Sequence, residues 1–245
     1  MRRLLSLQPF SLSFLTLVLL ALPSEAQART WKEVDRREHL DAIREQLDSG
    51  QWNEAAKLIA RAERAILERS RPKRNDDRAL AELALYVAVV EANSGDPNAA
   101  EWYWYTAFNL HQPTAYGDIS AWGRAAEVLG AIVVRDLGRD PKEIKSFRRF
   151  PNSDFEEPRS PTIKAPGSIG PSHELAEVRS FQVELFLDDT GQPHAPRLLG
   201  RLQLPIFFYS MLKQFHEKKW RPARSQGKPV AMLVEVTQAP KVDRW

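Results

Sequence analysis

The residue types that most often perform chemistry are present, but they form no recognisable catalytic pattern. The histidines are dispersed and lack the HExxH spacing of a zinc enzyme; they are His39, His111, His173, His194 and His216. The sequence contains no P-loop, Rossmann glycine pattern or G-x-S-x-G nucleophile motif. The carboxylate pairs Glu156–Glu157 and Asp188–Asp189 fall in a proline-rich stretch and in a turn, where no cleft is expected. We therefore expect no enzyme activity, no metal site and no cofactor.

Cysteine usage and charge narrow the function classes further. The chain has no cysteine, which excludes disulfides, thiol catalysis, cysteine-based zinc sites and iron–sulfur clusters. Its 35 basic and 32 acidic residues give a net charge of only +3. Nucleic-acid binding requires a strongly basic face, so we expect no nucleic-acid partner. No small-molecule substrate is indicated, and we expect a protein or peptide partner.

The first 28 residues are typical of a bacterial secretory signal. Arg2 and Arg3 precede an apolar run over 10–22, which would span about 20 Å as a helix, against a hydrocarbon core of about 30 Å. Ala26 and Ala28 supply the small residues of a cleavage site. We predict cleavage after Ala28 and a periplasmic location. The alternative is an uncleaved anchor that holds the protein in the inner membrane, facing the periplasm.

Composition divides the rest into a helical half (29–148), a proline-rich linker (149–172) and a C-terminal module (173–245). In the helical half, Gly50 and Gly95 each separate two stretches with apolar residues at helical spacing. Asp96 is a candidate helix cap, with Pro97 at the first helical position. These hairpins resemble tetratricopeptide-type repeats, which implies a concave peptide-binding surface. The aromatic run 102–105 is interpreted as hairpin packing, with a peptide platform at Trp102 or Tyr103 as the alternative.

In the C-terminal module, apolar and polar residues alternate with a period of two. We predict strands at 181–187, 194–199 and 230–236, with a helix over 204–219 between the second and the third. Gly191 ends the first turn, and Pro196 indicates an edge or bulged position. The predicted fold class is α+β: an all-α helical-hairpin domain followed by a small three-stranded antiparallel sheet with one helix.

The order of these elements, with the run W-R-P-A-x-x-x-G-x-P-V at 220–230, resembles the C-terminal domain of the TonB family over residues 172–238. The matching residues are Asp189, Gly191, Trp220, Pro222, Ala223, Gly227, Pro229 and Val230. The resemblance implies that an edge strand of the sheet pairs with short segments of partner proteins. Since alternation turns Met232 and Val234 toward the core, we expect the partner to contact the outward residues Ala231, Leu233, Glu235 and Thr237.

Together these patterns predict an exported, non-enzymatic adaptor of the cell envelope. The family's long proline-rich segment after a membrane anchor is missing, which favours a docking module over an energy transducer. Two alternatives stay open: a membrane-anchored TonB-type transducer serving outer-membrane receptors, and a structural protein that dimerises through the C-terminal module. A basic cluster at the end of the predicted helix suggests an acidic partner or simple solvation: Lys213, Lys218, Lys219, Arg221, Arg224 and Lys228.

Overall fold

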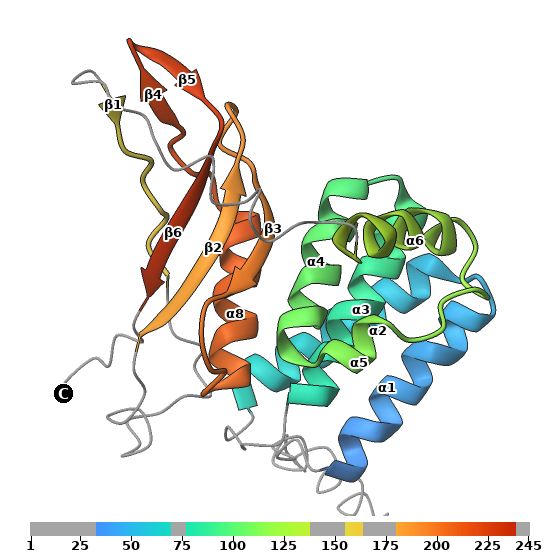
Figure 1. The fold of residues 1–245 in the computed structure, drawn as a ribbon. Coiled ribbons are helices and arrows are strands. Elements are labelled where there is room, and N and C mark those ends of the chain that lie inside the picture. The colour runs from blue at the N-terminus through green and yellow to red at the C-terminus, as the bar shows by residue number, and fades with distance from the viewer. Residues whose placement is uncertain (1–32, 70–76, 138–154, 164–179, 239–245) are drawn as a thin grey trace, which may run out of the picture.

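The computed structural model describes residues 33–69, 77–137, 155–163 and 180–238 (Figure 1). Within these ranges the helices of the N-terminal half are α1 (Glu33–Asp48), α2 (Trp52–Arg69), α3 (Asp77–Ser94), α4 (Pro97–Leu110), α5 (Gln112–Ala115) and α6 (Arg124–Leu137). The remaining elements are β1 (Phe155–Glu156), β2 (Phe181–Leu187), β3 (Pro193–Leu198), α8 (Pro205–Glu217), β4 (Ala223–Ser225), β5 (Lys228–Val230) and β6 (Met232–Gln238). The α+β class is confirmed. The predicted signal, 1–28, lies outside the described residues.

The helical half contains two antiparallel hairpins, α1–α2 and α3–α4, as the glycine positions predict. Gly50 and Gly95 have φ angles of +69° and +95°, which residues with a Cβ atom rarely adopt. Asp96 caps α4 by accepting hydrogen bonds from the backbone N–H groups of Asn98 and Ala99, at 3.1 and 2.9 Å. The α6 helix then packs across α3 and α4.

The C-terminal half contains two antiparallel sheets. The larger has the strand order β3-β2-β6 and matches the three predicted strands, except that the third begins at Met232, because Val230 belongs to β5 and pairs with Ala223. Phe181, Val183, Leu185 and Leu187 of β2 are buried in the core that this sheet forms with α8. The second sheet, with the order β1-β4-β5, was not predicted, because strands of two or three residues carry no readable alternation.

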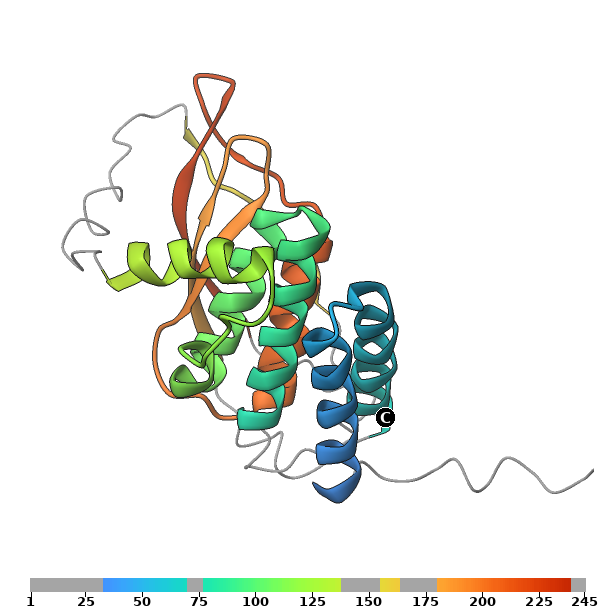
Figure 2. The same ribbon diagram turned by 90° about the vertical axis from the view of Figure 1, so that its right-hand side faces the viewer.

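The two halves share one hydrophobic core. Figures 1 and 2 show α8 between the sheet and the helical half, where it contacts α2, α3 and α4. The α4 helix therefore has neighbours on all sides, and the four aromatic residues 102–105 are all buried. Trp102 donates its indole N–H to the carbonyl oxygen of Leu212 on α8, at 3.1 Å. The alternative of a peptide platform at Trp102 or Tyr103 is wrong, because both rings are covered.

Part of the predicted linker, 155–163, is attached to the C-terminal half. It is extended, as expected, but β1 pairs with β4, and Arg159 forms a further bridge with Arg221. The ammonium group of Lys218 donates to the carbonyl oxygen of Thr162 at 2.6 Å, and Ile163 is buried in the core. These residues are therefore held against the end of α8 rather than free. The other linker residues, 149–154 and 164–172, lie outside the described ranges.

Candidate partner-binding edge

The last strand, β6, is an edge strand. In the sheet β3-β2-β6 it pairs with β2 along its whole length, from Phe181 opposite Gln238 to Leu187 opposite Met232. No other strand of the described residues pairs with it. The edge position predicted for the last strand is thus confirmed within the part of the chain that the structure describes.

The backbone direction of β6 follows from one hydrogen bond on β2. A strand residue directs its N–H and C=O to the same side, and successive residues alternate. The N–H of Leu199 donates to the carbonyl oxygen of Gln182, at 2.7 Å, so Gln182 faces β3. Its neighbours Phe181 and Val183 therefore face β6. The residues of β6 that pair with these alternate positions of β2 direct their backbone groups toward β2; they are Met232, Val234, Val236 and Gln238. Leu233, Glu235 and Thr237 consequently direct their backbone groups away from the sheet.

The side chains of β6 follow the same alternation. Met232 and Val234 point to the α8 side and are half-buried, whereas Val236 is buried. Glu235 and Thr237 are exposed, and Leu233 is half-buried. Ala231 is exposed but lies between β5 and β6, outside the strand. Three of the four predicted partner-contact residues therefore share the outer side of one edge strand, and the fourth lies immediately before it.

The opposite edge of the sheet is covered by the helical half. Asn109 of α4 donates its side-chain amide to the carbonyl oxygen of Pro196 at 2.7 Å, and its side-chain oxygen accepts from the N–H of Leu198 at 2.9 Å. Pro196 lies in a β-bulge of this edge strand, as predicted, and Ala195 beside it has a φ angle of +46°. Sequence reasoning missed Asn109, since nothing local in α4 indicates a contact with a strand 87 residues away.

The motif residues of the first turn have a structural role. Gly191 has a φ angle of +86°, and a Cβ atom there would lie 2.5 Å from the carbonyl oxygen of Trp220. Asp188, rather than the predicted Asp189, holds the turn: its carboxylate accepts from the N–H groups of Thr190 and Gln192, both at 2.9 Å. Burial alone would raise the pKa of Asp188, but these hydrogen bonds, together with those from the Thr190 hydroxyl and His194, lower it overall. Asp189 is exposed.

The remaining motif residues build the connection from α8 to β6. Trp220 is buried, donates its indole N–H to the carbonyl oxygen of Phe215 at 2.9 Å and packs edge-on against that ring. Pro222 lies beside Gly191. The β4–β5 hairpin pairs Ala223 with Val230 and turns at Gln226–Gly227, where both φ angles are positive, as a type I′ turn requires. Pro229, opposite Arg224, is exposed. The motif therefore positions β6 and does not itself form the outer edge.

The predicted basic cluster does not form a single patch. Lys213 points to the helical half and forms an ion pair with Glu63 at 2.7 Å. Lys218 is bound to Thr162, and Arg224 donates to the carbonyl oxygen of Gly227 at 3.1 Å. Lys219, Arg221 and Lys228 are exposed. Only part of the predicted cluster can therefore meet a partner.

The helical half has a hollow of its own between α1, α3 and α5, with a volume of about 370 Å³. Its floor contains Tyr86 and Trp122, whose rings meet edge-to-face at 5.8 Å, and Trp122 donates to a carboxylate oxygen of Asp48 at 2.7 Å. Burial, reinforced by Glu82, raises the pKa of Tyr86 to about 12. Arg44 and the Arg78–Glu82 ion pair line its rim. Aromatic rings under a charged rim can take up a peptide side chain.

The histidines do not gather. Among the described residues, no group of three or more histidine, aspartate or glutamate side chains could hold a metal ion. His216 stacks on Trp102 with ring centroids 5.5 Å apart, and burial lowers its pKa. His173 lies outside the described ranges.

None of the described helices combines the length and the apolar character needed to cross a bilayer. The chain matches no family model, no curated protein and no solved structure.

Proposed function

We propose that the protein is an exported periplasmic adaptor that binds an extended partner segment by strand addition to β6. The observation that carries the proposal is the asymmetry of the sheet. Asn109 covers the β3 edge, while Leu233, Glu235 and Thr237 present backbone groups at the β6 edge. Natural proteins cover or interrupt edges that are not used for pairing, so an edge that no described strand covers supports a role in binding.

The geometry also defines the expected affinity. Leu233 and Thr237 each offer one N–H and one C=O, and a protein hydrogen bond contributes about 0.5–1.5 kcal/mol net. Association costs at least about 4 kcal/mol, so the backbone contacts alone support only weak binding. Side-chain contacts must add to them. Leu233 lies opposite Phe186, which is 37% exposed, so this end of the edge favours an apolar partner residue.

The second binding surface of the adaptor is the hollow between α1, α3 and α5. Its aromatic floor and charged rim are separate from β6, because every residue that lines the hollow belongs to the helical half. Two partners could therefore be bound at the same time.

The test of strand addition is a change that removes one outward N–H group. Leu233→Pro deletes the N–H at the outer edge but leaves the hydrogen bonds to β2 intact. Leu233→Ala is the matched control, because it shortens the side chain and keeps the N–H. Cross-linking and pull-down from the periplasm should recover a partner with the unchanged protein and with Leu233→Ala, but not with Leu233→Pro.

Circular dichroism must show that both variants are folded. Recovery of the same partner by a folded Leu233→Pro variant would contradict edge addition. Sedimentation of the purified protein tests self-association. A dimer that Leu233→Pro dissociates would overturn the adaptor proposal in favour of a self-associating protein. N-terminal sequencing tests export, and an intact Met1 in the membrane fraction would support the anchored alternative.

A further inference from the structure

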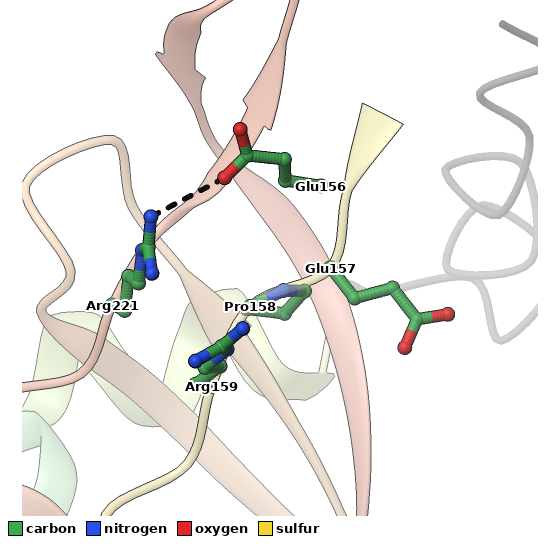
Figure 3. Close-up of a pocket in the computed structure, with 5 residues that line it drawn as sticks. All are labelled: Glu156, Glu157, Pro158, Arg159 and Arg221. Carbon is green, nitrogen blue, oxygen red and sulfur yellow. Dashed lines mark hydrogen bonds and ion pairs between the residues drawn. The ribbon is translucent and has the colours of Figure 1, made fainter. Parts of the chain in front are cut away.

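A second surface of the C-terminal half has the chemistry of an anion site. A hollow of about 400 Å³ beside β1 is lined by Glu156, Glu157, Pro158, Arg159 and Arg221 (Figure 3). None of these residues belongs to the outer side of β6 or to the hollow of the helical half. The site therefore stands or fails independently of the proposed function.

The backbone holds the two arginines opposite each other. The N–H of Arg159 donates to the carbonyl oxygen of Arg221 at 3.1 Å, and the N–H of Arg221 donates to that of Arg159 at 3.2 Å. Such a reciprocal pair places the two Cβ atoms about 5 Å apart. Like charges directly opposite each other on a ladder are destabilising. A bound anion that contacts both guanidinium groups would remove this repulsion.

The carboxylates that line the hollow neutralise the two arginines only weakly. Arg221 Nη2 lies 3.4 Å from Glu156 Oε2, a long contact between side chains that are 54% and 59% exposed. Figure 3 shows Glu157 extending away from both guanidinium groups. The side chain of Arg159 makes no hydrogen bond or ion pair to another described residue. Within the described part of the chain, the N–H donors of Arg159 are therefore available to a ligand.

Further positive charge lies next to the hollow. Arg224 of β4 stands opposite Glu156 in the register, and its Nε atom is buried without a hydrogen-bond partner. Lys228 of β5 is exposed at the end of the same hairpin. The paired segments 156–159 and 221–228 thus carry four cationic side chains and two carboxylates, and their net charge is positive.

We propose that Arg159 and Arg221 bind a carboxylate from an acidic peptide segment. A carboxylate is planar and offers two oxygens, which match the paired N–H donors of a guanidinium group. A phosphate offers the same geometry but carries up to two charges, and the nearby Glu156 and Glu157 repel a dianion more strongly than a monoanion. The incoming carboxylate replaces Glu156 beside Arg221.

The direct test is fluorescence anisotropy of a fluorescein-labelled hexaglutamate peptide with the purified exported protein at low ionic strength. Arg159→Gln and Arg221→Gln should each weaken binding about tenfold or more, because each removes charged hydrogen bonds. Arg159→Lys should also weaken it, because it keeps the charge but loses the bidentate geometry. Arg201→Gln is the matched control, since Arg201 is exposed in the same half and lies outside the hollow. It should leave binding within about twofold.

Glu156→Gln separates binding from folding. It removes the internal competitor, so the peptide should bind more tightly, a change that unfolding cannot produce. Equal weakening by Arg159→Gln and Arg201→Gln would show an effect of net charge alone and would refute the site.

Two further probes distinguish the source of the anion. Inorganic phosphate that binds through Arg159 while hexaglutamate does not would make this a phosphate site and overturn the proposal. Binding confined to phosphatidylglycerol vesicles would equally overturn it in favour of a membrane surface.

Discussion

Glu63 is the residue whose removal should most weaken the attachment between the two halves. It lies on α2 and is 9% exposed. One carboxylate oxygen accepts from the hydroxyl of Tyr209 at 2.5 Å, and the other accepts from the ammonium group of Lys213 at 2.7 Å. Both donors belong to α8. Burial by itself would lower the pKa of Lys213, but Glu63 and Glu217 raise it overall, so Lys213 keeps its charge.

The expected cost of Glu63→Ala follows from what it leaves behind. Removing one partner of a buried ion pair costs about 3–5 kcal/mol. The Lys213 side chain is 23% exposed and keeps Glu217 at 3.3 Å. The cost of leaving Lys213 without Glu63 therefore falls at the lower end of this range. The hydroxyl of Tyr209, a fully buried residue, loses its acceptor, which adds to the cost. We expect a loss of about 3–4 kcal/mol in the free energy of unfolding.

Urea unfolding followed by tryptophan fluorescence measures this loss. Glu54→Ala is the matched control: Glu54 lies on the same helix and forms an ion pair with Lys57 at 2.6 Å, but these side chains are 52% and 63% exposed. It should cost less than about 0.5 kcal/mol. A double-mutant cycle with Lys213→Met should give a coupling free energy above about 1 kcal/mol.

Two outcomes would refute the reasoning. If Glu63→Ala lowers the free energy of unfolding no more than Glu54→Ala, the contacts of Glu63 with Tyr209 and Lys213 do not hold α2 to α8. If the unchanged protein unfolds in two separate transitions, the two halves do not share one cooperative core.

Two further predictions concern the turn before β3 and the end of α8. Gly191→Ala should destabilise the fold by about 1–3 kcal/mol or more, because of its positive φ and its contact with Trp220. Gly130→Ala, in open space within α6, should instead stabilise it by up to about 1 kcal/mol; equal urea midpoints for the two would disprove the strain. Burial lowers the pKa of His216 from 6.5, against the opposing effects of Asp96 and Glu217. Its contribution to stability should therefore be complete above pH 6.5 and be lost as the pH falls through the folded-state pKa; an unchanged pH dependence of stability in His216→Gln would contradict this.

Local sequence alone determined the elements whose causes lie within a few residues. Gly50 and Gly95 end helices because of the backbone conformations that they permit, and Asp96 caps α4 through its nearest neighbours. Alternation over seven residues was enough to predict β2 and β6 and to say which side chains of β6 face outward. The edge position of β6 and the bulge at Pro196 also followed from the sequence.

Only the tertiary structure decided which surfaces are covered. The aromatic run in α4 has the same local pattern whether one face or every face is buried, and α8 buries the rest. The sequence pattern places Lys213 in a basic cluster, but Glu63, 150 residues away, holds it in the interface. The opposition of Arg159 and Arg221 likewise arises from pairing between distant segments. Such contacts depend on how the elements pack, and helical or strand periodicity carries no information about the partner that each face will meet.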